Sequence, residues 1–129
     1  MKRILADTND YAAFKKNEAA AVAAFRSVEY IGINIIVLGE LFSGFKGGSK
    51  EAQNRRELEQ FLASPRVDVV LPDEETAEFY AKIYWDLKKK GKPVPTNDIW
   101  VAASAMRHGL SLFTYDDHFN IISGLILYR

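Results

Sequence analysis

The sequence predicts an α/β fold in which a mainly parallel central sheet is flanked by helices. Short apolar runs typical of buried strands alternate with longer segments whose apolar residues recur at helical spacing, which is the pattern of βαβ units. The length of 129 residues is that of one domain, and 48% apolar with 26% charged residues is a globular composition. We therefore expect residues 1–129 to form a single domain.

Four segments are predicted at the N-terminal end. Residues 4–5 form a short apolar strand that ends before Asp7, and residues 10–14 have room for one helical turn. The Ala-rich residues 19–28 favour a helix by propensity. A second apolar run, residues 30–33, predicts the next strand.

Two helices and a strand follow. Asn34 is the predicted N-cap of the first helix, in which apolar residues recur at helical spacing until the glycine pair at residues 47–48. Residues 49–62 repeat the helical pattern, and the Ser-Pro pair at residues 64–65 ends it. Residues 67–71 are rich in Val, which favours a strand.

The last part of the chain carries two helices, a loop and two strands. The first helix begins at residues 72–73 and ends in the cationic turn and glycine of residues 88–91. A loop at residues 92–96 leads to the second helix, residues 98–108, which Gly109 ends. The strands are residues 110–115 and, more briefly, residues 125–128. The predicted core face of the first of these helices consists of Ala77, Tyr80, Ala81, Tyr84 and Leu87.

Composition excludes several classes of protein and site. The 17 basic residues balance 17 acidic ones, so nucleic-acid binding needs a local basic patch rather than overall charge. The absence of Cys excludes disulfides and thiolate metal sites. No apolar run reaches the roughly 18 residues of a membrane span, and Asp7 and Asp10 interrupt the N-terminal apolar stretch before it can serve as a signal peptide. We therefore expect a cytoplasmic protein without a membrane segment.

Four acidic residues stand out by their positions. Asp7 and Asp116 each follow a predicted strand, and a parallel sheet brings such positions to one edge. Glu40 shares a helical stripe with apolar residues, so we expect it to face the core, where an unpaired carboxylate is costly. Asp98 begins its helix on the apolar face and is also expected to point inward.

Each of these acids has a simpler explanation when taken alone. Asp7 is a turn former or N-cap, Asp116 a turn residue, Asp98 an acid favoured by the helix dipole, and Glu40 a partly exposed or Arg-paired side chain. Taken together, four acids at one edge repel one another unless they are protonated or share a cation. Oxygen ligands without Cys favour Mg²⁺ or Mn²⁺, ions that commonly serve phosphate chemistry. The residues themselves thus predict a metal-dependent phosphoester hydrolase, in which neither histidine is needed if a metal-activated water is the nucleophile.

Four segments resemble, in order and spacing, the motifs of the PIN-domain ribonucleases, and in particular those of the VapC toxins of toxin–antitoxin pairs. They are residues 5–9 (LADTN), 36–44 (IVLGELFSG), 97–103 (NDIWVAA) and 112–119 (LFTYDDHF). The resemblance covers nearly the whole chain. It implies a three-layer PIN-like fold in which residues 1–129 are a single PIN domain.

The resemblance also implies roles for the site residues. The catalytic acidic quartet, which would hold Mg²⁺ or Mn²⁺, is Asp7, Glu40, Asp98 and Asp116. The expected supports, which would orient carboxylates or water, are Thr8, Asn9 and Thr114. Two residues depart from the pattern: Asn34 stands where many relatives begin this helix with Ser or Thr, and His118 where some carry a further acid. A second metal is therefore expected to bind only weakly or with RNA present.

The activity and partners implied by the resemblance are those of a toxin nuclease. A metal-activated water held by the quartet would hydrolyse an RNA phosphodiester, leaving a 5′-phosphate and a 3′-hydroxyl, with tRNA or ribosomal RNA as typical targets. The resemblance further implies a homodimer. It also implies inhibition by a VapB-type antitoxin whose C-terminal segment lies near the acids.

Two groups of residues are candidates for binding surfaces. The basic residues just before Asp98 are Lys88, Lys89, Lys90 and Lys92. They could guide the RNA backbone by charge, they could meet the antitoxin instead, or they could be a solvated helix C-terminus. The aromatic group is Phe79, Tyr80, Tyr84 and Trp85, which we expect to divide between the core and a dimer interface, with base stacking as the alternative.

Other functions fit parts of the pattern. The same motifs would be found in a PIN-like module that binds RNA or protein without cleavage. They would also be found in a housekeeping RNA-processing nuclease without a toxin role. A phosphatase with Asp7 as covalent nucleophile needs a second Asp two residues later, where this chain has Asn9. A receiver-type domain needs a Lys at the end of the last long strand, which this chain lacks, and no Gly-rich phosphate loop suggests nucleotide binding.

Overall fold

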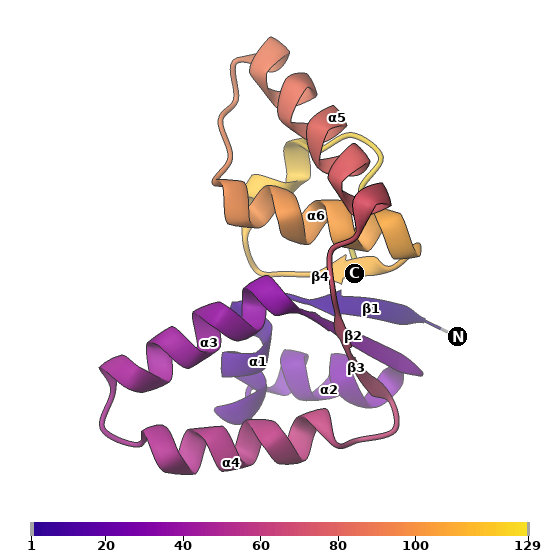
Figure 1. Cartoon of the computed structure of the whole chain (residues 1–129). Helices are drawn as coiled ribbons and strands as arrows, with labels where there is room; N and C mark the ends of the chain where they lie inside the picture. The colour runs from indigo at the N-terminus through magenta and orange to yellow at the C-terminus, as the bar shows by residue number, and fades with distance from the viewer. Residues whose placement is uncertain (1, 129) are drawn as a thin grey trace.

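A four-stranded parallel sheet organises the chain, with helices on both faces (Figure 1). The computed structural model describes residues 2–128. The strands, in the order β3-β2-β1-β4 across the sheet, are β3 (Val67–Val70), β2 (Tyr30–Asn34), β1 (Arg3–Ala6) and β4 (Ser111–Phe113). Every strand pair is parallel. The carboxyl ends of these strands therefore lie at one edge, as predicted.

The helices form a layer on either side of the sheet, which gives the three-layer α/β fold expected from the sequence (Figure 1). One side carries α1 (Thr8–Lys15), α2 (Ala19–Ser27), α3 (Ile35–Gly47) and α4 (Glu51–Leu62). The other side carries α5 (Glu74–Lys90), α6 (Thr96–His108) and the short 3₁₀ helix η1 (Asp117–Ile121). The starts of α1, α3 and α6 all meet the carboxyl edge of the sheet.

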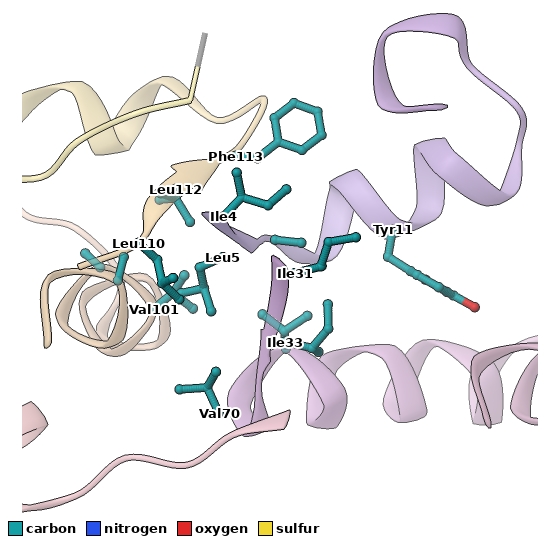
Figure 2. Close-up of a cluster of buried hydrophobic side chains, with 14 of the residues drawn as sticks. Ile4, Leu5, Tyr11, Ile31, Ile33, Val70, Val101, Leu110, Leu112 and Phe113 are labelled. Atoms are coloured by element: carbon teal, nitrogen blue, oxygen red, sulfur yellow. The ribbon is translucent and has the colours of Figure 1, made fainter. Parts of the chain in front are cut away.

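The central strand β1 is buried on both faces, which fixes the site at its end. Ile4 and Leu5 are fully buried, and Leu5 pairs in register with Gly32 of β2. Figure 2 shows Leu5 beside Val101 and Leu110, on the side of the sheet covered by α6. Because both faces of β1 are packed, Asp7 leaves the sheet in a fixed direction.

Several predicted boundaries and caps are confirmed. Asn34 caps α3, with its Oδ1 accepting a 2.7 Å hydrogen bond from the Ile36 N–H. Gly91 and Gly109 end α5 and α6 at φ values of 67° and 65°, a left-handed conformation that favours glycine.

Three predictions about local structure need correction. The helix expected at residues 10–14 begins earlier, at Thr8, because Asp7 caps it. The buried face of α5 is formed by Thr76, Ile83 and Leu87, while three residues of the predicted face are exposed, namely Ala77, Ala81 and Tyr84. Residues 125–128 form only one isolated bridge, between Leu112 and Leu127, rather than a strand.

Among residues 2–128, none of the helices combines the length and the hydropathy needed to cross a bilayer.

Candidate metal centre

Asp7 lies where β1 ends and α1 begins. Its Oδ1 accepts a 2.9 Å hydrogen bond from the Thr8 N–H, and its Oδ2 accepts one of 2.9 Å from the Thr114 hydroxyl. The residue is only 7% exposed. Burial is the largest cause of its raised pKa, the two hydrogen bonds oppose that rise, and the charges of Glu40 and Asp116 add to it. Asp7 is thus a fixed carboxylate in a negative environment.

Asp98 is the third residue of α6 rather than its first, and its side chain is only 18% exposed. Its pKa is raised to about 6, first by burial and then by the negative charge of Asp7, with smaller increments from Asp116 and Glu40. The neighbouring His118 opposes this rise. The expectation that Asp98 points inward is therefore met.

Asp116 follows β4 and caps η1. Its Oδ1 accepts a 3.1 Å hydrogen bond from the His118 N–H. Its own N–H donates to the Thr114 hydroxyl oxygen at 3.0 Å. Thr114 therefore ties the backbone of Asp116 to the carboxylate of Asp7.

Glu40 differs from the expectation, because it is exposed rather than facing the core. It lies on the solvent side of α3, at the rim of the carboxyl edge, and its Oε1 accepts a 2.6 Å hydrogen bond from the Thr8 hydroxyl. Its charge nevertheless acts on the pKa of both Asp7 and Asp98. The structure thus brings all four predicted acids into one neighbourhood, with Glu40 on its open side.

His118 lies between two of the acids, a position that sequence reasoning did not foresee. Its Nδ1 is 3.3 Å from Asp98 Oδ2, and its Nε2 is 2.9 Å from Asp116 Oδ1. Ligand atoms of these three residues all lie within 4.8 Å of one another, close enough to hold one metal ion. The sequence signal was the short spacing from Asp116 to His118. This spacing brings the two side chains together only because η1 makes a tight turn between them.

Asp10 is a second residue that sequence reasoning missed. It is fully buried, and its Oδ2 accepts a 2.8 Å hydrogen bond from the Asp7 N–H. Its Oδ1 has no hydrogen-bond partner within residues 2–128. Burial raises the pKa of Asp10 to about 8, and the charge of Asp7 adds to the rise. The available sequence signal was the capping-box spacing, an acid three residues after an N-cap acid.

A buried polar link holds the Glu40 helix against the Asp98 helix. Asn34, which caps α3, donates a hydrogen bond from Nδ2 to the Ser104 hydroxyl of α6, and Ser104 in turn donates to the Trp100 carbonyl at 2.9 Å. Asn34 and Ser104 are both fully buried. The link fixes the relative position of the two helices.

Within residues 2–128, the remaining predicted residues make no hydrogen bond or ion pair with the clustered acids. Asn9 is exposed on the first turn of α1. The four lysines face different surroundings: Lys88 lies over the rings of Tyr84 and Trp85, Lys90 pairs with Asp86 at 3.1 Å, and Lys89 and Lys92 are exposed.

The donor set at the carboxyl edge fits a divalent cation. Its oxygens come from four carboxylates whose negative charges raise the pKa of Asp7 and Asp98, so a shared cation would relieve their repulsion. Carboxylate oxygens suit Mg²⁺ and Mn²⁺. The chemistry available to such a site is the stabilisation of negative charge on a phosphate.

Comparison with known proteins agrees with this fold. The family model described as the PIN domain matches residues 4–125. Ribonuclease VapC4 of Mycobacterium tuberculosis is 30% identical over 120 residues, covering 92% of this chain and 90% of the relative. Ribonuclease VapC1 of Haemophilus influenzae is 31% identical over 114 residues, covering 85% and 84% of the two chains.

A solved structure is similar over nearly its whole length. The crystal structure of VapBC2 from Rickettsia felis, bound to a DNA fragment from the promoter, superposes with a TM-score of 0.87 at 26% identity, covering 97% of this chain and 96% of that one. The sequence match, the shared fold and the clustered acids lead to one assignment. The chain belongs to the PIN-domain family and, within it, to the VapC branch.

Proposed function

We propose that this chain is a metal-dependent endoribonuclease that hydrolyses RNA phosphodiester bonds and acts as the toxin of a toxin–antitoxin pair. The observation that carries the proposal is the gathering of four carboxylates from separate segments at the carboxyl edge. Beyond the effect of burial, Asp98 has its pKa raised by Asp7, Asp116 and Glu40. Such an arrangement of carboxylates is costly unless a bound cation offsets their mutual repulsion.

The proposed ligands are Asp7, Asp98, Asp116 and Glu40, with Mg²⁺ or Mn²⁺ as the ion. A divalent cation held there neutralises charge on the phosphodiester and lowers the pKa of a coordinated water towards neutrality. This role needs carboxylates that are ionised and correctly oriented.

The chain supplies that orientation through hydroxyl groups. Thr114 fixes one oxygen of Asp7, and Thr8 holds Glu40. Glu40 is exposed and the His118 side chain is 41% exposed, so this side of the cluster is open to a phosphate backbone. The proposed basic contacts of the RNA are Lys88, Lys89, Lys90 and Lys92, all of which are exposed.

The proposed partners follow from the relatives. The similar Rickettsia felis structure is a VapBC complex, so a VapB-type antitoxin is the partner proposed for this chain. We further propose a homodimer that acts in the cytoplasm on tRNA or ribosomal RNA, with residues 1–129 as one PIN domain. Asn9 is the remaining proposed support of the acids.

The direct test of the activity is cleavage of total tRNA and ribosomal RNA by purified protein. Wild type is expected to release fragments with 5′-phosphate ends in Mg²⁺ or Mn²⁺, and to release none in EDTA. Asp7→Asn should lose cleavage while keeping its fold. Asp117→Asn, which removes the same charge at an exposed neighbouring position, should retain it. Cleavage that persists in EDTA or in Asp7→Asn would refute the proposal, and RNA binding without products would favour a non-cleaving PIN-like module.

The toxin role has a separate test in cells. Induced expression of wild type should arrest growth, and Asp7→Asn should not. Co-expression of an antitoxin encoded beside the gene should restore growth. Growth that continues with active enzyme present would point instead to a housekeeping nuclease.

A further inference from the structure

The imidazole of His118 is held in place over the acids. The residue follows the Asp116 N-cap of η1, and its N–H donates to Asp116 Oδ1 at 3.1 Å. The next residue, Phe119, is 1% exposed and anchors the turn in the core. The ring is therefore presented to the cluster by a fixed backbone rather than by a mobile loop end.

The ring of His118 faces both acids, each through a different nitrogen. With metal–ligand bonds of about 2.1 Å, adjacent ligand atoms on an octahedral cation lie roughly 3 Å apart. Nδ1 of His118 is 3.3 Å from Asp98 Oδ2 and Nε2 is 2.9 Å from Asp116 Oδ1, so each of these distances belongs to a different nitrogen. A single ion binds only one of these nitrogens. Because one ligand atom from each of His118, Asp98 and Asp116 can be chosen so that all three lie within 4.8 Å of one another, one cation can be shared by an imidazole nitrogen and two carboxylate oxygens.

We infer that His118 is a nitrogen ligand of the cation held by Asp98 and Asp116, and that the site therefore prefers a divalent first-row transition ion such as Mn²⁺ to Mg²⁺. The inference rests on the proposed function, because it concerns the ion of the same centre. Mg²⁺ is a hard ion that selects oxygen ligands, whereas imidazole nitrogen raises the affinity of a site for ions of the transition series.

The same geometry would also allow His118 to oppose metal binding, and this role predicts the opposite effect of replacing His118 on cation affinity. If His118 acted only as a cationic counter-charge for Asp98 and Asp116, its ring would compete with the metal. Replacing it would then strengthen the binding of every divalent cation. If His118 is a ligand, replacing it weakens Mn²⁺ binding much more than Mg²⁺ binding.

The test is pulsed EPR of Mn²⁺ bound to the full chain, which detects nitrogen coupled directly to the ion. Wild type is expected to show an imidazole ¹⁴N coupling that His118→Gln abolishes. The chain offers a matched control in its other histidine: His108 lies at the far end of α6, about 15 Å along the helix from Asp98, and is exposed. His108→Gln should leave the coupling unchanged, and labelling this variant with ¹⁵N-histidine should convert the signal to that of ¹⁵N.

Calorimetric titration of the same proteins gives a second readout. His118→Gln should weaken Mn²⁺ binding by about tenfold or more and Mg²⁺ binding by less than about threefold. Mn²⁺ that binds to wild type without nitrogen coupling, or binds more tightly to His118→Gln, would overturn the inference while leaving the metal centre intact. Failure of wild type to bind either ion would overturn both the inference and the proposed function.

Discussion

The Thr114 hydroxyl donates a 2.9 Å hydrogen bond to Asp7 Oδ2, which joins the end of β1 to the segment after β4. The same hydroxyl oxygen accepts the N–H of Asp116 at 3.0 Å. One small side chain thus sets the orientation of one acid and the backbone position of another. The spacing of these acids depends on it.

Replacing Thr114 by Val, which keeps the shape and removes the hydroxyl, should weaken divalent cation binding by about tenfold. It should also lower the free energy of unfolding by about 1 kcal/mol, because the Asp116 N–H loses its partner. Thr114→Ser keeps the hydroxyl and should retain most of the affinity. Calorimetric titration of the three proteins checks this. Equal affinity in Thr114→Val would mean that Asp7 needs no such support.

The buried pair formed by Asn34 and Ser104 should contribute measurably to stability. Asn34→Ala removes both the cap of α3 and the link to α6, so we expect the free energy of unfolding to fall by about 2–3 kcal/mol. Ser104→Ala should cost less, about 1 kcal/mol, because the cap remains. Urea unfolding of the single and double variants would give the coupling energy. Strictly additive losses would show that the two side chains act independently.

The buried Asp10 makes stability depend on pH in a specific direction. Its pKa is about 8 in the folded protein, against an ordinary value of 3.8 in the unfolded chain. Between these values only the folded state keeps the proton, so stability falls as pH rises, by up to about 1.4 kcal/mol per pH unit, and levels off above the folded pKa.

Asp10→Asn cannot ionise and can still accept the hydrogen bond from the Asp7 N–H. The stability advantage of this variant over wild type should therefore grow from about pH 5 to about pH 8 and then stay constant. Urea unfolding in EDTA at several pH values measures it. Asp117→Asn, at an exposed position, serves as the control and should show no such trend. A difference independent of pH would mean that Asp10 is ionised in the fold.

Gly32 lies where β2 passes close to the side chains on the α6 side of the sheet. A Cβ at this position would be 2.9 Å from Val70 Cγ2 and 3.1 Å from Leu5 Cδ1. Gly32→Ala should therefore destabilise the protein by about 1–3 kcal/mol through overpacking. Gly44→Ala, in α3 with no atom within 4 Å of the added Cβ, should instead stabilise it by about 0.5–1 kcal/mol. Thermal unfolding of the two variants distinguishes the expected loss of stability from the expected gain. Unchanged stability in Gly32→Ala would indicate that the neighbouring side chains move aside at little cost.

Sequence reasoning succeeded where a local signal decides the structure. The alternation of strands and helices predicted the parallel sheet, and the left-handed glycines Gly91 and Gly109 marked two helix ends. Strand ends located Asp7 and Asp116, because parallel strands bring such positions to one edge.

The sequence was insufficient where packing between distant segments decides which side chains are buried and which lie close together. Aromatic residues cover a wide arc of α5, so periodicity alone selected Tyr84 for a face that the structure assigns to Ile83 and Thr76. Glu40 shares a stripe with apolar residues but is exposed, because the buried face of α3 is formed by Val37, Leu38 and Leu41 and Glu40 lies to one side of it. The place of His118 between Asp98 and Asp116 depends on the turn of η1 and on its distance from α6, neither of which has a pattern in the sequence.

The central claim is that carboxylates from separate segments serve one divalent cation. Calorimetric titration of Mg²⁺ and Mn²⁺ into wild type, Asp98→Asn and Asp117→Asn tests it most directly. The account predicts saturable binding by wild type and by Asp117→Asn, and a loss of about tenfold or more in affinity for Asp98→Asn, although both variants lose the same charge. Equal affinities in the three proteins would contradict it.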